Sequence, residues 1–179
     1  MRLARDEEGA WSLTDPLVKG VDIGTVLGDT PAARQEAVEQ LAREIGAHRV
    51  DTVHFTWQGG EPTLLGLDYF KLVVALQHKY AQGKQIQNGF QTNGVLLDDA
   101  WCRFFAEHDF LIGLSIDGPE TIHDQYRKTT GGGGSFQEVM AGLDLLKKHE
   151  VEFNTLTVVQ AGNVKHEDEV SELLKTIGS

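Results

Sequence analysis

The hexapeptide Trp57-Gln58-Gly59-Gly60-Glu61-Pro62 is the stretch around which the rest of the chain is arranged. It follows residues 53–57, where apolar and polar residues alternate as in a β-strand. The two glycines leave main-chain N–H groups uncovered, so a ligand can approach them closely. Glu61 can accept hydrogen bonds from an amine, and Pro62 cannot continue a central strand. The stretch therefore indicates a small ammonium site at the carboxyl end of a strand, with a plain strand-to-helix turn as the alternative.

The residues before this strand fall into two parts. Residues 1–29 are broken by four glycines and show at most one short strand, so we expect an irregular lead-in. A helix is predicted over residues 30–46, because Thr30 and Pro31 supply an N-cap and a proline at the first helical position. Gly46 is expected to end this helix. Its apolar face carries Ala33, Ala37, Leu41 and Ile45.

Four further helices are predicted after the hexapeptide from their caps and apolar faces. Asp68 is expected to cap the first, and Asp98 with Asp99 to start the second. Ser135 and Glu138 predict a capping box at the start of the third. The fourth is expected from about residue 166 to residue 177. The residues expected to point inward are Phe70, Val73, Val74, Leu76, Trp101, Phe104, Phe105, Phe136, Val139, Met140, Leu143 and Leu146.

The strand predicted over residues 110–116 indicates which of its faces packs on helices. Its even-numbered residues are bulky and apolar, whereas Leu111, Gly113, Ser115 and Asp117 become small and polar toward the carboxyl end. Since alternate residues face opposite sides of a sheet, one face should pack on helices and the other should leave room for a ligand. Two more strands are predicted, over residues 86–92 and 153–159.

The order of elements is one helix followed by four strand–helix pairs. This alternation predicts an α/β fold, in which crossover helices cover a parallel sheet. About four strands cannot close a complete barrel, so the expected architecture is a partial TIM barrel over residues 30–179. Polar groups follow the strands at residues 58–61, 91–93, 115–117 and 158–160. Ligands bind at the carboxyl ends of strands in such folds, so we expect a site there.

Composition and charge narrow the classes of function. A net charge of −11 argues against a protein that follows nucleic-acid phosphates. No apolar run approaches the roughly 20 residues of a membrane helix, and the start lacks an apolar signal-peptide core. We therefore expect no membrane partner and a cytoplasmic location. The single cysteine, Cys102, is expected to be a buried structural thiol. Gly131–Gly134 lacks the Lys-Ser/Thr of a phosphate loop, so we interpret it as a hinge.

Four stretches, in order, carry a resemblance to a known family: Phe55–Leu64, Gln91-Thr92-Asn93-Gly94, Ser115–Pro119 with His123–Arg127, and Val151–Val159. They resemble the radical S-adenosylmethionine (SAM) superfamily. More narrowly, they resemble the anaerobic sulfatase-maturating enzymes, which oxidise a cysteine or serine of a sulfatase to formylglycine. The resemblance covers roughly residue 50 to the end.

The resemblance implies a cofactor, SAM, and a set of residues that hold it. Gly59, Gly60 and Glu61 match the motif that meets the methionyl amino group. Ser115 and Arg127 match positions that hold SAM, the latter through its carboxylate. The other candidates for this pocket are Gln58, Asn93 and Asp117.

For these candidates, simple structural roles remain open. Asn93 with Gly94, and Asp117 with the following Gly-Pro, can serve only as turns. Arg127 can simply pair with the carboxylate at position 120 or 124. The histidines do not cluster with acids or cysteines at ligand spacing, so no metal site is predicted. No catalytic residue is assigned.

The family also implies a [4Fe–4S] cluster on a Cys-x3-Cys-x2-Cys loop, which this chain lacks. We therefore expect a truncated form that keeps the SAM pocket and lacks activity alone. Its partners would be a sulfatase-type substrate protein and a completing chain. The first alternative is a non-catalytic interaction module that associates through open sheet edges. A second alternative is an acid–base enzyme that uses Glu61 and Asp117.

Overall fold

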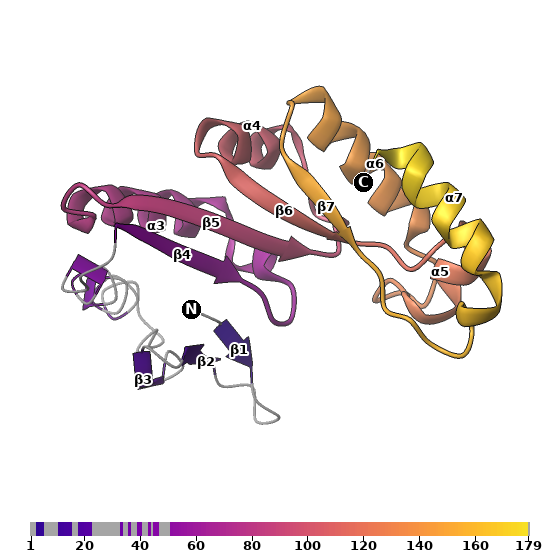
Figure 1. The fold of residues 1–179 in the computed structure, drawn as a ribbon, viewed down its shortest axis with the longest axis horizontal. Coiled ribbons are helices and arrows are strands. Elements are labelled where there is room, and N and C mark those ends of the chain that lie inside the picture. The colour runs from indigo at the N-terminus through magenta and orange to yellow at the C-terminus, as the bar shows by residue number, and fades with distance from the viewer. Residues whose placement is uncertain are drawn as a thin grey trace. The chain divides into compact units, whose positions relative to one another are not determined.

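The computed structural model divides the chain into two compact units, residues 1–90 and 91–179, and each is described by itself. The residues that the structure describes are 3–5, 11–15, 18–22, 33, 36, 39, 40, 43, 45, 46 and 51–178. In Figure 1, β4 (Thr52–Trp57) lies beside β5 (Gln85–Thr92), and β6 (Phe110–Ser115) lies beside β7 (Phe153–Leu156). The division between the units falls within β5, whose last two residues belong to the second unit.

Three short strands form an antiparallel sheet near the start of the chain, in the order β1-β2-β3. They are β1 (Leu3–Arg5), β2 (Trp11–Asp15) and β3 (Val18–Asp22). The expectation of at most one strand before residue 30 is therefore wrong. Residues 11–14 alternate apolar and polar, which is a strand signal. Asp15 pairs with Val18, so only two residues separate the strands, and the first is a proline suited to a turn.

The described residues between positions 33 and 46 are all helical, as predicted. Gly46, which we expected to end the helix, is itself helical. Lys84 donates two hydrogen bonds of 2.9 Å from Nζ to the main-chain oxygens of Ile45 and Gly46. Carbonyl groups at a helix end lack partners within the helix, so this lysine satisfies them from outside. The predicted cap at Thr30 and Pro31 lies outside the described residues.

Strand β4 (Thr52–Trp57) pairs in parallel with β5 (Gln85–Thr92), and helix α3 (Leu67–Tyr80) connects them. The predicted alternation is confirmed, since Phe55 and Trp57 are buried while His54 and Thr56 are exposed. Phe70 of α3 lies edge-on to the ring of Trp57, with ring centroids 5.3 Å apart. The inward residues of α3 are also confirmed. This packing anchors the carboxyl end of β4, immediately before the glycine turn.

The predicted cap of α3 is wrong. Asp68 lies within the first turn of the helix, and the N-cap is Gly66, with a φ of 83°. The 3-10 helix η1 (Pro62–Leu65) comes directly before it and has Glu61 as its own N-cap. The chain leaves β4 through η1 rather than through an open loop, and α3 begins directly after Gly66.

A cluster of three buried polar side chains lies inside the first unit. Oδ1 of Asn88 accepts hydrogen bonds from Nε1 of Trp57 at 3.0 Å and from Nε2 of Gln77 at 2.9 Å. Nδ2 of Asn88 donates back to Oε1 of Gln77 at 2.9 Å. The cluster joins β4, α3 and β5, so its hydrogen bonds fix the rotamer of Trp57 beside the turn.

The second unit contains the parallel strands β6 (Phe110–Ser115) and β7 (Phe153–Leu156). Ile112, Leu114 and the following Ile116 are fully buried, whereas Leu111 is exposed, which confirms the predicted faces of this strand. Helices α4 and α6 lie on the buried side (Figure 1). The helices are α4 (Asp99–Glu107), α5 (Glu120–Tyr126), α6 (Phe136–Lys148), η2 (Val164–His166) and α7 (Glu167–Ile177).

Several boundaries in this unit test the sequence predictions directly. Asp98 caps α4 by accepting a hydrogen bond from the main-chain N–H of Trp101 at 2.8 Å, as predicted. Cys102 is fully buried, also as predicted. Helix α5 was not predicted, and β7 ends at Leu156, earlier than expected. None of the described helices is both long and apolar enough to pass through a membrane. The α/β class with parallel strands is confirmed.

Candidate functional site

The first group of candidate residues occupies the turn after β4. Gly59 has a φ of 107° and Gly60 a φ of 55°, conformations that L side chains rarely adopt. Oε1 of Glu61 accepts hydrogen bonds from the main-chain N–H of Thr63 at 3.1 Å and from its hydroxyl at 2.7 Å. Gln58 is half-buried at the start of the turn. The structure therefore holds a carboxylate rigidly beside two glycines at a strand's carboxyl end.

Asn93 forms the turn that the sequence allowed. Its Oδ1 accepts a hydrogen bond from the main-chain N–H of Val95 at 3.0 Å, and the hydroxyl of Thr92 accepts one from Gly94 at the same distance. Gly94 has a φ of 78°, and a Cβ there would lie 2.5 Å from Cδ1 of Leu114. The turn after β5 thus requires glycine. A role of Asn93 toward a ligand stays a prediction.

Ser115 is the last residue of β6, and its hydroxyl has no hydrogen bond to any residue that the structure describes. Ser115 is a buried residue, with 6% of its surface exposed. Gly113 lies on the same strand face, where a Cβ would come 2.8 Å from Cδ1 of Leu156. This face of β6 therefore has a glycine covered by Leu156, followed by a buried hydroxyl, and a role of Ser115 toward a ligand stays a prediction.

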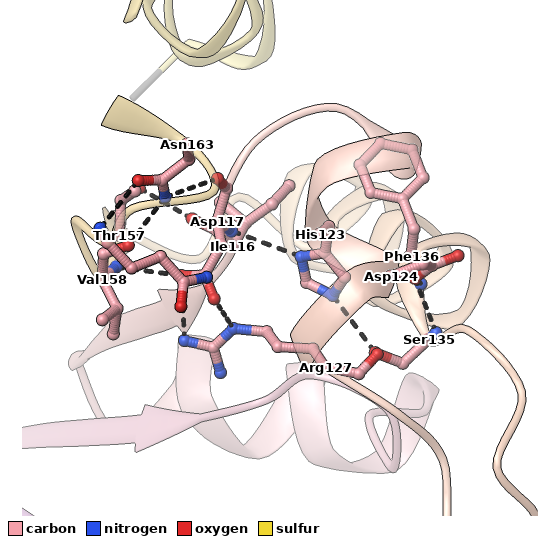
Figure 2. Close-up of polar contacts among 11 residues, drawn as sticks. Ile116, Asp117, His123, Asp124, Arg127, Ser135, Phe136, Thr157, Val158 and Asn163 are labelled. Carbon is pink, nitrogen blue, oxygen red and sulfur yellow. Dashed lines mark hydrogen bonds and ion pairs between the residues drawn. The ribbon is translucent and has the colours of Figure 1, made fainter. Parts of the chain in front are cut away.

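Asp117 and Arg127 form a two-point ion pair (Figure 2). Nε of Arg127 donates to Oδ2 of Asp117 at 2.6 Å, and Nη2 donates to Oδ1 at 3.1 Å. The Asp117 side chain is 4% exposed and that of Arg127 is 25% exposed. The alternative that Arg127 pairs with Asp124 or Glu120 is wrong. Both partners were predicted site residues, and the structure brings them into direct contact.

Asp124 caps the start of helix α6 in the second unit. Its Oδ1 accepts hydrogen bonds of 2.9 Å from the main-chain N–H groups of Ser135 and Phe136, at the start of α6. The predicted capping box is therefore wrong, because the side chain of Ser135 makes no capping hydrogen bond. A carboxylate from α5 replaces it, and negative charge at a helix N-terminus is favourable.

A buried histidine connects the backbones of the ion pair (Figure 2). Nδ1 of His123 accepts a hydrogen bond from the main-chain N–H of Asp117 at 3.3 Å, which places the ring proton on Nε2. Nε2 lies 3.1 Å from the hydroxyl of Ser135, which in turn donates to the main-chain oxygen of Arg127 at 3.0 Å. Burial lowers the pKa of His123, and the positive charge of Arg127 lowers it further. The histidine is thus held neutral.

Asn163 ties together the segments that follow β6 and β7. Its Nδ2 donates to the main-chain oxygens of Val158 at 2.7 Å and Asp117 at 3.3 Å. Its Oδ1 accepts a hydrogen bond from the main-chain N–H of Gln160 at 2.8 Å. His123, Ser135 and Asn163 were not predicted as members of this network. Each contacts Asp117 or Arg127 across at least six residues of sequence, so no local spacing pairs them.

The two groups of candidates belong to different units. Gln58, Gly59, Gly60 and Glu61 lie in the first unit, and Asn93, Ser115, Asp117 and Arg127 lie in the second. Each group offers chemistry suited to one end of an amino acid. In the first unit, a carboxylate beside a glycine turn suits an ammonium group. In the second unit, a partly exposed guanidinium suits a carboxylate.

The residues of this chain do not fit a [4Fe–4S] cluster. Cluster ligands are thiolates, usually several of them, and the sequence contains one cysteine. Burial raises the pKa of the Cys102 thiol to about 11, with the carboxylates of Asp98 and Asp99 adding to the shift. Among the described residues, no three His, Cys, Asp or Glu side chains are grouped so that they could hold a metal ion. We therefore derive no step through a cluster.

The chain is similar to anaerobic sulfatase-maturating enzymes of two types. A serine-type anaerobic sulfatase-maturating enzyme of Bacteroides thetaiotaomicron is 47% identical over 132 residues, which cover 73% of this chain and 32% of the relative. A cysteine-type enzyme of Clostridium perfringens is 39% identical over 143 residues, which cover 79% of this chain and 39% of the relative. The chain thus spans 32% and 39% of the length of these two relatives.

Solved structures agree with the expected fold. The structure of native anSMEcpe with bound AdoMet has a TM-score of 0.76 and 38% identity, over 78% of this chain and 38% of that chain. This confirms the expected partial radical SAM barrel. The profile of the radical SAM superfamily matches residues 21–176. Because that match covers most of the sequence, the chain belongs to the radical SAM superfamily.

Proposed function

We propose that this chain binds SAM at the carboxyl ends of its strands, as part of a protein of the anaerobic sulfatase-maturase type. The observation that supports this most is the Asp117–Arg127 pair. It holds a partly exposed guanidinium in a fixed position. Ser115, two positions before Asp117, has a hydroxyl that makes no hydrogen bond to the described residues. A fixed guanidinium and a hydroxyl are a suitable pair of donors for a carboxylate.

In this proposal each end of the methionyl group has its own residues. The guanidinium of Arg127 and the hydroxyl of Ser115 hold the carboxylate. The turn at Gly59 and Gly60 and the carboxylate of Glu61 receive the amino group, because a positive-φ glycine turn lets the ligand approach the main chain. Gln58 and Asn93 line the pocket. Bound SAM supplies a sulfonium that can accept an electron in radical chemistry.

The activity of the whole protein is also part of the proposal. The support is that the relatives are named serine-type and cysteine-type anaerobic sulfatase-maturating enzymes. We propose that the whole protein oxidises a serine or cysteine of a sulfatase to formylglycine, with that sulfatase as partner and the cytoplasm as location. We propose that these 179 residues alone do not cleave SAM reductively, since a single buried cysteine cannot supply three thiolates. Thiolates from other polypeptide would be required.

A second candidate is a non-catalytic interaction module. Strand β7 is the last in its sheet among the described strands, and the nearby side chains of Leu156, Val158 and Val159 are 40%, 57% and 76% exposed. Apolar residues beside a sheet edge favour pairing with another chain. Analytical ultracentrifugation over a range of concentrations tests this candidate, because a monomer at every concentration contradicts self-association.

Thermal unfolding with and without SAM tests the first candidate. A ligand that binds only the folded state stabilises it by about 2.7 kcal/mol at a hundredfold excess over Kd, which corresponds to roughly 5–10 °C for a chain of this size. We expect this shift in the parent and its loss in Glu61→Ala. Glu172→Ala is the matched control, because Glu172 is an exposed glutamate of α7. A cooperative transition that ignores SAM would contradict SAM binding.

A further inference from the structure

The guanidinium of Arg127 has two edges that can each hold an acceptor with two oxygens. Asp117 occupies the side edge, formed by Nε and Nη2. The end edge, formed by Nη1 and the second N–H of Nη2, makes no hydrogen bond to any residue in the described part of the chain. The pair therefore leaves one complete two-point donor edge for a carboxylate from outside the chain.

Asp117 is fixed at its side chain and at both of its main-chain groups (Figure 2). Oδ1 accepts a hydrogen bond from the main-chain N–H of Val158 at 2.9 Å, in addition to the one from Arg127. The main-chain N–H donates to His123, and the main-chain oxygen accepts from Asn163. With its side chain 4% exposed, Asp117 has little surface left for a ligand.

Arg127 is fixed by the same histidine. Its main-chain N–H donates to the main-chain oxygen of His123 at 3.0 Å, and its main-chain oxygen accepts from Ser135, which contacts the His123 ring. Both members of the ion pair are thus tied to His123 through their backbones. A long, flexible side chain held at its base and along one edge loses most of its freedom before a ligand arrives.

We propose that Asp117 is a positioning residue, which aims the end edge of Arg127 at the carboxylate of SAM without touching SAM itself. The proposal rests on the proposed function, since it assumes that SAM is the ligand. A carboxylate at the ligand's own carboxylate would repel it, so direct contact by Asp117 is unfavourable. Because Asp117 also neutralises Arg127, recognition of the ligand depends on the direction of the N–H groups more than on net charge.

The affinities for SAM and for decarboxylated SAM distinguish this positioning role from a general effect on folding. Decarboxylated SAM keeps the amine, the sulfonium and the adenosyl group and lacks only the carboxylate. We expect the parent to bind SAM about 10- to 100-fold more tightly than decarboxylated SAM, the range for charge-assisted hydrogen bonds. Isothermal titration calorimetry of the 179-residue chain measures both dissociation constants directly.

The main variant is Asp117→Asn. Its amide nitrogen would face the Nε–H of Arg127, donor against donor, so the guanidinium should swing away. SAM affinity should fall to the level of decarboxylated SAM, while the affinity for decarboxylated SAM stays within about twofold. Asp117→Glu keeps the charge but moves the carboxylate by one methylene, and should lose SAM affinity too. The matched control is Asp99→Asn, which removes the same charge from an exposed ion pair of α4.

The outcomes are distinct. Equal loss of both ligands in Asp117→Asn would make Asp117 a structural residue and overturn the proposal. Full SAM affinity in Asp117→Glu would show that charge alone suffices, which also overturns it. Parent protein that binds neither ligand would refute the proposed function, and the proposal with it. Nitrogen-15 NMR of the Arg127 Nε–H group adds a readout without ligand: the proposal requires protection from exchange in the parent and loss of protection in Asp117→Asn.

Discussion

Replacing Asn88 with leucine should destabilise the first unit strongly. Asn88, Gln77 and Trp57 are 7%, 5% and 2% exposed, so water cannot replace the hydrogen bonds that leucine removes. Three hydrogen bonds are lost. The indole N–H of Trp57 and both the nitrogen and the oxygen of the Gln77 side-chain amide are then without partners. Each unsatisfied buried group costs about 1–3 kcal/mol. With some relaxation, we expect the free energy of unfolding to fall by about 3–5 kcal/mol.

The double variant Gln77→Met with Asn88→Leu makes the reasoning refutable. It removes both partners of two hydrogen bonds and leaves only the Trp57 N–H unpaired. We expect it to be more stable than Asn88→Leu alone by about 1–2 kcal/mol, because replacing both partners costs less than orphaning one. Urea titration, followed by tryptophan fluorescence and far-ultraviolet circular dichroism, gives both values. A change below about 0.5 kcal/mol in Asn88→Leu, or a double variant less stable than either single variant, would refute the account.

Three further predictions concern the second unit. Asp124→Ala should lower the free energy of unfolding by about 1–2 kcal/mol, measured by urea titration, because it removes the cap of α6. Hydrogen bonds from Lys148 and then His149 lower the pKa of Asp99 to about 2, from an ordinary value of 3.8. This stabilisation is present above pH 3.8 and is lost as the pH falls toward 2, so thermal melts of the parent and Asp99→Asn should converge across that window. Cys102, whose thiol pKa is about 11, should react with Ellman's reagent at pH 8 only after the chain unfolds in urea.

Much of the fold could be predicted because its signals are local. The period-2 alternation through Phe55 and Trp57 identifies β4 and its buried face within a few residues. The same holds for β6, where parity separates Ile112 from Leu111. The cap at Asp98 works for the same reason, since donor and acceptor lie three residues apart. Where the chain's own neighbours decide the structure, the sequence is sufficient.

The site network could not be predicted because its partners come from different elements. The alternative left open for Arg127 was a pairing with the carboxylate at position 120 or 124. Its partner is Asp117, which precedes α5 and is held there by Val158. Ser135 shows the same limit. Its sequence context satisfies the capping-box rule, but its hydroxyl finds partners in His123 and Arg127, so the local rule loses to tertiary contacts. A sequence pattern indicates which hydrogen bonds a side chain can form. The elements packed around it determine which of them it forms.

Charge explains why an arginine that is proposed to bind a carboxylate in this chain would need such support. The chain has a net charge of −11, a field that draws cations toward it and repels anions. The proposed ligand carries a sulfonium, an ammonium and a carboxylate, so its net charge suits the field while one end opposes it. Only a short-range, directional contact can hold that end. The Asp117–Arg127 pair has this character, because it is neutral at a distance and yet presents an edge of N–H donors at hydrogen-bonding range.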